Sequence, residues 1–456
     1  MILAIDCGST NHKVALFDEE LRRLATRFAP VAYIVRDAER VEFEPEKSWR
    51  DTCLLIRQAC AAAGIQSRQI TTVALASQAQ TFTLLNMPGE PIVPFLSWAD
   101  KRAQEESAEL AKGMGARFHR HCSFPAPLPQ LQLSKLLWLA RRLSPALRAR
   151  TRVVSLPAFL ALRLAGLHCS DSNLAAMSGL YSLTKGDWWP EALSACSLEI
   201  ESCGQVVEIG TAVPAVAPCA ELELSPELRV VFAGNDQTAG AYGTGAEGLV
   251  ITLGTALVAF RFAGTATGPF QEAGCWGPYP GGGFYELLTR DEGCAALDWA
   301  VAQSRPGDET GFLDLGASAP CGGALFYPQH IHTPNAWLGS DDPAVRARAV
   351  LEGICFSMRE LVDNMSPPGT AREAVTAIGG GSANPFWLTI LANVLNRPVH
   401  RGQGDILLGA AMLARPGVEP SHPANAGSFL PESNKVEEYE QVYYTWREHA
   451  PSPLLT

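Results

Sequence analysis

The sequence predicts an α/β protein with two domains, each built from a mixed β-sheet with flanking helices. The chain has 456 residues, which is more than one hydrophobic core usually supports. Its 47% hydrophobic content supplies ample core, and 40 glycines with 32 prolines suit a protein rich in loops. A strand–turn–strand pattern also occurs twice, roughly half a chain apart. The two domains are expected to span residues 1–244 and 245–456.

The pattern is clearest in the middle of the chain, at residues 233–260 (AGNDQTAGAYGTGAEGLVITLGTALVAF). An apolar strand breaks at Gly234 and presents Asn235, Asp236 and Gln237 before a helix of small residues begins. An acid at such a strand-to-helix turn lies near exposed backbone N–H groups, a usual setting for anion chemistry. A plain β-turn with a capping Asp gives the same pattern, so these residues alone leave both interpretations open.

The same central stretch continues into a hairpin. A strand is predicted over 249–253, a turn at Gly254 and Thr255, and a returning strand over 256–262. The turn is made of small residues, so its backbone can approach a ligand closely.

A second copy of this hairpin opens the chain. Residues 2–6 predict a strand that contains Asp6, and Gly8, Ser9 and Thr10 lie in a small-residue turn before a strand over 13–18. Two such hairpins that face each other across a cleft can hold a polyphosphate between their turns. Neither turn matches G-x-x-x-x-G-K-[ST], so a P-loop is excluded.

The other elements follow from strand and helix periodicity, with cap residues or prolines at helix starts and glycines at helix ends. Further strands are expected at 27–35, 72–76, 81–85 and 374–378. Helices are expected at 44–64, 133–140, 156–164, 292–302 and 343–365, and from 384 and 434 onward. The segment 170–179 is small and polar and is expected to form a loop near the substrate.

Polar residues follow the strand at 72–76, and a second polar group lies about twenty residues later. Gln78 and Gln80 stand at the carboxyl end of a strand, where ligands bind in α/β sheets; a solvated turn is the alternative. Asp100 is suited to accept hydrogen bonds from two vicinal hydroxyls while Trp98 packs on an apolar sugar face. The alternative for Asp100 is a helix N-cap, and one Asp can serve both purposes.

Three successive glycines, Gly379, Gly380 and Gly381, follow the predicted strand at 374–378, and a helix begins near Asn384. Glycines let a flat base or a phosphate lie directly on the backbone. A flexible turn is the alternative. The strand–glycine–helix context favours nucleotide contact.

Composition and the remaining motifs exclude several classes of protein. The formal charge of −11 argues against a nucleic-acid partner, because phosphate backbones require clustered Lys and Arg. The 12 cysteines are scattered and form no C-x-x-C, which is typical of reduced thiols. The first residues lack a basic region, and no apolar run reaches the ~18–20 residues that a membrane span requires. A cytoplasmic enzyme with no membrane partner is therefore expected.

Two local motifs are rejected. His119, His121 and Cys122 lie close together but lack a fourth ligand at a recognisable spacing, so a zinc site is not expected there. His330 and His332 call for the same conclusion. The residues from Gly243 to Gly248 match G-x-G-x-x-G, but a strand follows them and not the helix that a dinucleotide fingerprint requires.

Taken in order, these motifs resemble the FGGY family of carbohydrate kinases, in the superfamily of sugar kinases, heat-shock chaperones and actin. The resemblance covers nearly the whole chain. It consists of the first hairpin at 2–17, W-x-D-x-R at 98–102, Asp-Trp at 187–188, Gly-Asn-Asp-Gln at 234–237, Gly-Thr at 254–255 and GGGSANPFWLTILANVLNRPV at 379–399. It implies two ribonuclease H-like, actin-like ATPase domains with a cleft between them, ATP and Mg²⁺ as cofactors, and a small-molecule sugar as substrate.

The resemblance also assigns roles. Asp236 is the expected general base, and Asp6 is expected to hold Mg²⁺ through water. The expected nucleotide-binding residues are Gly8, Ser9, Thr10, Lys13, Gly254, Thr255, Gly379, Gly380, Gly381 and Asn384. The expected sugar-binding residues are Gln78, Gln80, Trp98, Asp100 and Gln237, whereas Arg102 is interpreted as mainly structural.

Several departures from the family pattern leave the sugar open. Ala79 and Gln80 lie where xylulose kinases carry Met-His and glycerol kinases Arg-Glu, so the pocket is roomier or differently shaped. Asn393 replaces the usual Asp, and Gly402–Asp405 lacks a common Glu. D-xylulose is the first candidate substrate, and sedoheptulose, ribulose or a glycerol-like polyol are the alternatives. An actin- or chaperone-like ATPase and a catalytically retired sugar-binding regulator are the competing classes, and a homodimer is compatible with the sequence.

Overall fold

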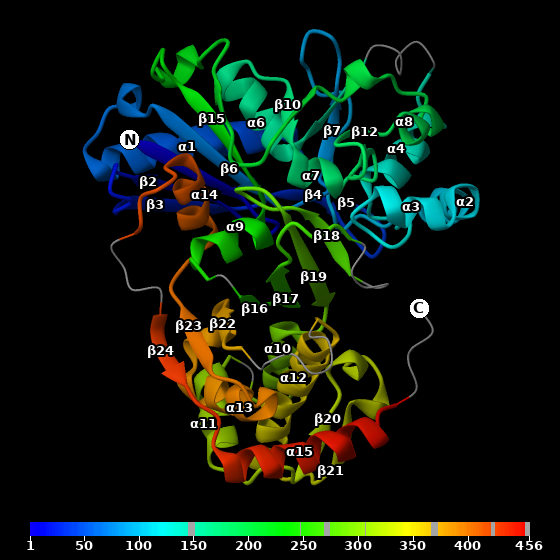
Figure 1. The fold of residues 1–456 in the computed structure, drawn as a ribbon, viewed down its shortest axis with the longest axis vertical. Helices are drawn as coiled ribbons and strands as arrows, with labels where there is room; N and C mark the ends of the chain where they lie inside the picture. The colour runs from blue at the N-terminus through cyan, green and yellow to red at the C-terminus, as the bar shows by residue number, and fades with distance from the viewer. Residues whose placement is uncertain are drawn as a thin grey trace. The chain divides into compact units, whose positions relative to one another are not determined.

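The computed structural model describes residues 1–144, 151–246, 248–268, 274–305, 307–365, 373–420 and 425–451. The chain is α/β, as the sequence predicts, and it divides into two compact units (Figure 1). The first unit combines Met1–Gly245, Ala263–Glu286 and Gly404–His422. The second combines Ala246–Phe262, Leu287–Gln403 and Pro423–Thr456. Each unit therefore gathers segments that are far apart in the sequence.

The first unit contains a six-stranded mixed sheet with the order β14-β15-β6-β1-β2-β3. These strands are β14 (Ala212–Pro214), β15 (Arg229–Asn235), β6 (Thr72–Ser77), β1 (Ile2–Cys7), β2 (Asn11–Phe17) and β3 (Arg23–Pro30). The central strand β1 pairs parallel with β6 and antiparallel with β2. Because β15 is also parallel to β6, the carboxyl ends of β1, β6 and β15 meet at one edge of the sheet.

The second sheet has the order β18-β19-β17-β16-β22-β23-β24. Its strands are β18 (Cys275–Pro278), β19 (Phe284–Arg290), β17 (Leu257–Phe262), β16 (Leu249–Leu253), β22 (Val375–Ile378), β23 (Val399–Gly402) and β24 (Asn425–Phe429). Strand β16 pairs antiparallel with β17 and parallel with β22, and β22 is parallel to β23. This is the pairing pattern of β1, β2, β6 and β15, so the two hairpins that the sequence analysis identified occupy equivalent places in the two sheets.

Smaller sheets complete the strand inventory. A five-stranded sheet has the order β4-β5-β8-β7-β9, with β4 (Tyr33–Arg36), β5 (Val41–Phe43), β8 (Phe95–Leu96), β7 (Phe82–Leu85) and β9 (Arg152–Ser155). Three two-stranded sheets pair β10 (Cys169–Asp171) with β13 (Gln205–Val207), β11 (Tyr181–Ser182) with β12 (Asp187–Trp188), and β20 (Ala324–Phe326) with β21 (Trp337–Gly339).

Helices flank the sheets in both units. The first unit contains α1 (Pro45–Ala63), α2 (Gln104–Met114), α3 (Ala116–His121), α4 (Gln132–Ala140), α6 (Leu156–Ala165), α7 (Ser172–Ala176), α8 (Pro190–Ala195), α9 (Asp236–Gly243) and α14 (Ile406–Ala414). The second contains α10 (Cys294–Ser304), α11 (Glu309–Ala317), α12 (Pro343–Met365), α13 (Pro385–Leu395) and α15 (Ser433–Glu448). Within the described residues, every helix is too short or too polar to span a bilayer.

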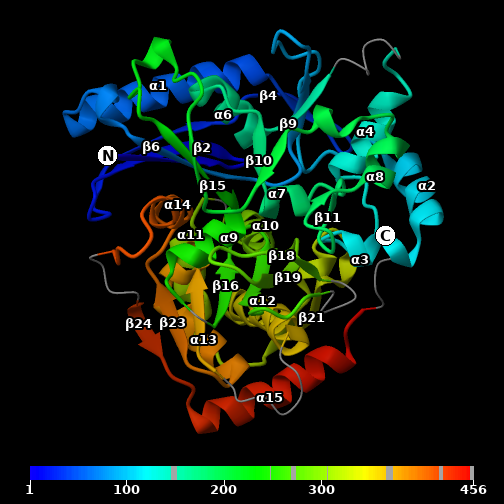
Figure 2. The same cartoon turned by 45° about the horizontal axis from the view of Figure 1, so that its top comes forward.

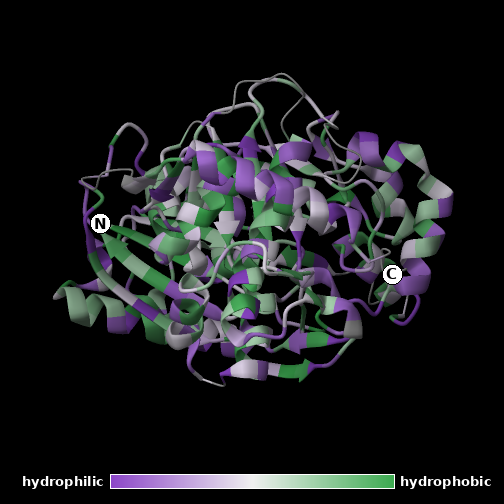
Figure 3. Cartoon of the chain, turned by 90° about the horizontal axis from the view of Figure 1, so that it is seen from below, coloured by the Kyte–Doolittle hydropathy of each residue, from purple (hydrophilic) through white to green (hydrophobic). Residues whose placement is uncertain are grey.

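The helices carry hydrophobic and hydrophilic stretches together (Figure 3), and their apolar residues form the cores. In α1, Trp49, Cys53 and Ile56 are buried in the core of the first sheet. In the second unit, α12 and α13 fill the core, and α15 adds Tyr439 and Trp446 to it. The helix expected from residue 434 onward is thereby confirmed.

Two sequence expectations about local structure are wrong in whole or in part. The strand expected over 27–35 does pair with β2 as β3, but β3 ends at Pro30, and residues 33–36 form β4 in a different sheet. Proline has no N–H to continue the ladder, and the next residue donates its N–H to the Thr10 carbonyl instead. The loop expected over 170–179 contains β10 and α7, and the Asp171 side chain caps that helix.

Helices α9 and α14 cross at unusually short range because glycines line the crossing (Figure 1 and Figure 2). A Cβ atom on Gly409 would lie 1.8 Å from the Ala239 carbonyl oxygen, and one on Gly404 would lie 2.0 Å from the Gly243 carbonyl oxygen. No L side chain larger than hydrogen fits at these distances. The crossing places the first half of α14 against the middle and the end of α9, at Ala239 and Gly243.

This crossing yields a stability prediction. Gly409→Ala is expected to lower the free energy of unfolding by roughly 3 kcal/mol, because the new methyl group overlaps backbone that cannot move away easily. Gly113→Ala in α2 is the matched control: a Cβ there meets nothing within 4 Å, and the change is expected to stabilise the helix by about 0.5–1 kcal/mol. Urea denaturation of both variants measures the difference, and equal stabilities would contradict the tight crossing.

Candidate active site

Asp6 lies on β1 near the carboxyl edge of the first sheet, with its side chain 1% exposed. The Lys13 ammonium on the antiparallel strand β2 lies 3.4 Å from Asp6 Oδ2. Asp6 Oδ1 is buried and has no hydrogen-bond partner in the described part of the chain. Burial raises the pKa of the Asp6 carboxyl to about 7; the Lys13 charge opposes this rise, and the Asp236 and Asp405 charges add to it. The four groups therefore act on one another electrostatically.

The turn after β1 passes close to the buried Asp6 carboxylate. A Cβ on Gly8 would lie 2.9 Å from the Asn11 carbonyl oxygen and within 4 Å of both Asp6 carboxylate oxygens. Glycine is therefore the residue that this close turn requires. The Tyr33 hydroxyl donates to the Ser9 carbonyl at 2.6 Å and holds the turn from the neighbouring segment.

Asp236 is the first residue of α9 and directly follows β15. Gly234 makes the bend with φ of +74°, and the Asn235 side chain caps the helix by accepting from the Thr238 N–H. The Asp236 side chain is only partly exposed, and the surrounding protein raises its pKa to about 6 by burial, against the hydrogen bond from the Gln237 N–H. A carboxyl with this pKa is ionised at neutral pH and is a better base than a solvated Asp.

A buried amide network supports this bend. Asn173 Oδ1 accepts from the Asn235 backbone N–H at 2.9 Å and from its side-chain amide at 2.7 Å. Asn173 Nδ2 donates to Thr238 Oγ1 and to the Pro278 carbonyl. A Cβ on Gly234 would also lie 2.9 Å from Asn173 Oδ1. The Asn173 side chain thus bonds to the Asn235 backbone just before Asp236 and to the Thr238 side chain just after it.

Asp405 adds a third acid near this edge of the first unit. It caps α14 by accepting from the Leu408 N–H at 2.8 Å and pairs with the Arg23 guanidinium at 2.7 Å. Asp405 lies in the segment that departs from the family pattern, and the structure gives it a structural partner on β3. Asn393, the other departure, accepts the Glu432 N–H and so holds the start of α15.

Four of the five predicted sugar-binding residues follow β6 or β8 in the chain, and the fifth, Gln237, is the second residue of α9. Gln78 follows β6; its Nε2 donates to the Gly8 carbonyl at 3.3 Å, while its Oε1 is buried and has no partner among the described residues. The hydrogen bond to Gly8 connects the turn after β1 with the predicted sugar-binding segment after β6. Trp98 is 42% exposed, and its backbone N–H donates to Thr81 Oγ1 at 3.0 Å, which ties the two loops together.

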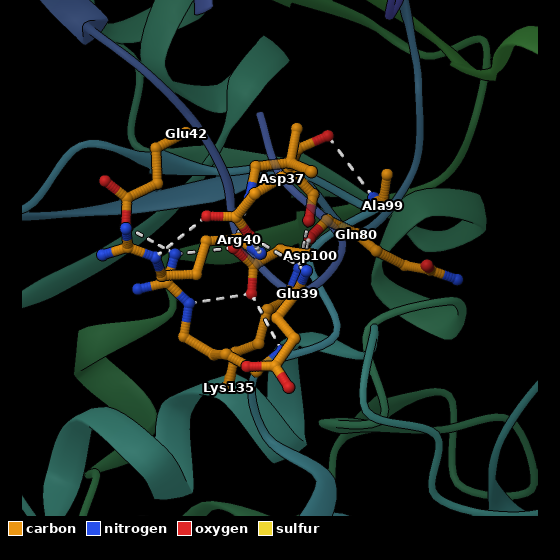
Figure 4. Close-up of polar contacts among 11 residues, drawn as sticks. Asp37, Glu39, Arg40, Glu42, Gln80, Ala99, Asp100 and Lys135 are labelled. Carbon is orange, nitrogen blue, oxygen red and sulfur yellow. Dashed lines mark hydrogen bonds and ion pairs between the residues drawn. The ribbon is translucent and has the colours of Figure 1, made fainter. Parts of the chain in front are cut away.

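Asp100 is completely buried and already fully engaged. Its carboxylate accepts from the Arg102 guanidinium at 2.6 and 2.8 Å and from the Val41 N–H at 2.8 Å (Figure 4). Arg102 also pairs with Glu42 at 2.5 Å. Direct contact of Asp100 with a sugar stays a prediction, and the observed bonds describe a residue that holds the Trp98 loop. The structural role expected for Arg102 agrees with this geometry.

In the second unit, three segments converge at the end of β16. Gly254 accepts from the Cys294 N–H at 2.7 Å and Thr255 from the Gly293 N–H at 3.0 Å, both at the start of α10. A Cβ on Gly293 would lie 2.6 Å from the Gly254 carbonyl oxygen. Thr255 itself is exposed. The sequence analysis identified the Gly-Thr turn but not the helix start that supports it.

The glycine run after β22 lies against the same strand end. Gly379 has φ of +90°, and a Cβ there would lie 2.6 Å from the Leu253 carbonyl oxygen. A Cβ on Gly381 would lie 2.7 Å from the Trp387 ring, whereas one on Gly380 meets nothing within 4 Å. Asn384 caps α13 by accepting from the Trp387 N–H. Gly379 and Gly380 therefore present exposed backbone without side chains next to the Gly-Thr turn.

A metal ion bound at this edge of the first unit would have few protein ligands. No group of three or more His, Cys, Asp or Glu side chains in the described ranges is arranged to hold one. This excludes a dedicated all-protein cage among those residues. Mg²⁺ commonly takes only one or two carboxylates and completes its shell with water and substrate phosphates. The unpartnered, buried Oδ1 of Asp6 fits such a site.

Comparison with solved structures defines the class of fold. The chain superimposes on the ligand-bound xylulose kinase from Lactobacillus acidophilus with a TM-score of 0.86 and 20% identity, covering 98% of this chain and 97% of the other. The fold is thus that of a two-domain, actin-like sugar kinase.

Sequence comparison identifies the family. The family model "FGGY family of carbohydrate kinases, N-terminal domain" matches residues 1–243, and the model of the C-terminal domain matches 249–415. The chain belongs to the FGGY family of carbohydrate kinases and is a phosphotransferase. The xylulose kinase of Escherichia coli (strain K12) is 26% identical to this chain, and the match covers 92% of this chain and 90% of that kinase. The autoinducer-2 kinase of a Klebsiella pneumoniae strain is 28% identical, over 87% of this chain and 82% of its own.

The structure brings the predicted site residues together in two groups. Asp6, Lys13, Gln78 and Asp236 lie at one edge of the first unit with the Gly8 turn, and the Gly-Thr turn and glycine run lie together in the second. Asn173 was missed by the sequence analysis. Its segment was expected to be a loop near the substrate, and nothing in its local sequence indicates that its amide meets Asn235, 62 residues away.

Removing the amide beneath Asp236 tests the network. Asn173→Ala is expected to lower the free energy of unfolding by about 1–3 kcal/mol, because the buried Asn235 N–H loses its acceptor, and to reduce kcat as Asp236 loses its support. Asn86→Ala is the control, since the Asn86 side chain bonds to nearby Glu90 in an exposed turn; its effect should stay within about 0.5 kcal/mol. Chemical denaturation measures both, and similar losses would refute the supporting role.

Proposed function

We propose that the protein transfers the γ-phosphoryl group of ATP to a hydroxyl of a ketose, with D-xylulose as the first candidate. The observation that carries this proposal is the pair of carboxylates at the edge of the first sheet, Asp6 and Asp236, which share the field of one lysine, Lys13. One carboxylate has an unpartnered oxygen suited to a hydrated cation, and the other stands at a helix start with a raised pKa. Phosphoryl transfer needs both a means of neutralising charge and a base.

Asp236 is assigned as the base. The sugar hydroxyl gives its proton to the Asp236 carboxylate as its oxygen forms a bond to the γ-phosphorus, while the bond from that phosphorus to the bridging oxygen breaks and ADP leaves. The proton then rests on Asp236 until solvent removes it. Because the carboxylate is fixed by the Asn235 cap and the Asn173 network, its position contributes to the rate as well as its basicity.

The glycine-rich segments are assigned to the nucleotide. Gly254 and Thr255, with Gly379 to Gly381, offer exposed backbone on which phosphates and a base can lie, and Asn384 fixes the helix that follows. Gly8, Ser9 and Thr10 offer a second set of backbone N–H groups next to Asp6. Bound Mg²⁺ would neutralise charge on the phosphates, and Asp6 would hold its water shell.

The sugar is assigned to the Gln78–Gln80 and Trp98 side of the first unit. The free Oε1 of Gln78 is an acceptor for a hydroxyl, and the exposed Trp98 ring suits the apolar face of a sugar. Gln80 and Gln237 add further amides. A ketose is favoured because the sequence relatives include a xylulose kinase that matches over 92% of this chain.

A substrate panel tests this function. ADP release is measured with MgATP and, separately, D-xylulose, D-ribulose, sedoheptulose, glycerol, an aldose and no sugar, and the phosphorylated carbon is identified by NMR. D-xylulose is expected to give the largest kcat/KM, well above release without sugar. A faster reaction with glycerol or an aldose would contradict the ketose assignment. Equal release with and without every compound would contradict the assigned acceptor class.

A further inference from the structure

Lys135 is a buried cation that the proposed reaction does not use. It lies on α4, and its side chain is completely buried. Its ammonium donates to the Ser97 carbonyl at 2.7 Å and to the Gln80 carbonyl at 3.2 Å. It also lies 5.5 Å from the centre of the Phe82 ring. Both acceptors are backbone atoms of the loops that carry the candidate sugar-binding residues Gln80 and Trp98.

The Gln80 backbone is strained at the point where Lys135 holds it. Gln80 has φ of +61°, in the left-handed region that residues with a Cβ avoid at a cost of about 1–2 kcal/mol. Such conformations persist only where the surrounding structure enforces them, and they cluster at functional sites. The hydrogen bond from Lys135 to the Gln80 carbonyl is one enforcing contact. The Thr81 hydroxyl, which accepts the Trp98 N–H, is another.

The second loop is anchored on its other side by charge. Figure 4 shows Asp100 among the side chains of the neighbouring segments, with Lys135 close by. Asp100 is held by Arg102 and by the Val41 N–H, and its own backbone N–H donates to the Ser97 carbonyl. The Ser97 carbonyl thus accepts two hydrogen bonds, one from the Lys135 ammonium and one from the Asp100 backbone N–H. Trp98 lies between these two fixed points.

Burying a charged ammonium costs free energy, and a neutral side chain of the same size would be easier to bury. Burial lowers the pKa of Lys135 to about 7; the charge of Asp100 opposes this change, and the charge of Arg102 adds to it. Protonated Lys135 and Arg102 balance Asp100 and Glu42, so the cluster is neutral overall. The cation therefore completes a local charge balance while it joins two loops.

We propose that Lys135 is a positioning residue for the sugar: its ammonium joins the Gln80 and Ser97 carbonyls and so fixes how Gln80 and Trp98 face a sugar hydroxyl. This inference rests on the proposed assignment of those two side chains to the sugar. The hydrogen bonds of Lys135 go to the loops of Gln80 and Trp98, not to the turn that carries Asp236. Its loss should therefore weaken sugar recognition and leave the nucleotide side unchanged.

Lys135→Met removes the charge and the donors at nearly constant length. The KM for the best ketose of the panel is expected to rise roughly 10- to 100-fold, since two buried carbonyls lose a charged donor. The KM for ATP should change less than about twofold and kcat less than about threefold, because only substrate binding is affected. Lys112→Met is the matched control, since Lys112 is exposed on α2; it should behave like the unaltered protein.

A double-mutant cycle separates positioning from general damage. In the Gln80→Ala background, Lys135→Met should raise the sugar KM much less than it does alone, because the side chain that it positions is already gone. Lys135→Arg keeps the cation and should restore part of the affinity. Additive effects, or a sugar KM for folded Lys135→Met within about twofold of the unaltered protein, would overturn the inference.

Two further outcomes remain decisive. If neither Lys135 variant folds, hydrogen exchange of the unaltered protein is measured with and without sugar. Joint protection of residues 78–85 and 95–102 supports the inference, and protection of neither overturns it. If the unaltered protein phosphorylates no sugar, the proposed function fails and this inference with it. If it phosphorylates a sugar but the Lys135 effects are absent, only this inference fails.

Discussion

Two carboxylates and one ammonium at the edge of the first sheet are the constraint on which the rest of this structure depends. Burying an ionised carboxyl is unfavourable unless a charge or a donor compensates it. Among the described residues, Lys13 is the cation that pairs with Asp6, and the raised pKa values of Asp6 and Asp236 reflect incomplete compensation of their burial. In the proposed mechanism, a cation bound to the phosphates compensates the remaining negative charge.

Keeping these charged groups in fixed positions requires rigid surroundings. The Asn173 amide fixes both sides of Asp236, and the glycine crossing of α9 and α14 allows two helices to approach the sheet through small side chains such as Ala74, Ala76 and Ala239. On the proposed sugar side, we assign the same purpose to the Asp100–Arg102 pair and Lys135, which hold two loops. In the proposed mechanism, the groups that react are separate from the groups that hold them.

Sequence reasoning predicted the fold class and the repeated hairpin because both depend on local signals. Strand-length apolar runs, small-residue turns and cap residues are readable over ten or twenty residues, and β1–β2 and β16–β17 are such units. The roles of Asn173 and Lys135 were not predictable in this way. Each depends on a partner far away in the sequence, at Asn235 or at Gln80 and Ser97, and a polar residue in an apolar stretch does not reveal its partner. Asp100 illustrates the same limit, since either a ligand or an anchor fits its sequence context.

The central claim is that Asp236 takes the proton from the sugar hydroxyl, and single-turnover phosphoryl transfer by Asp236→Asn tests it most directly. Asn keeps the size of the side chain and removes the base. The account predicts that transfer slows about 10²- to 10⁴-fold, while calorimetry shows ATP and sugar bound with affinities close to those of the unaltered protein. Transfer at an undiminished rate would contradict it.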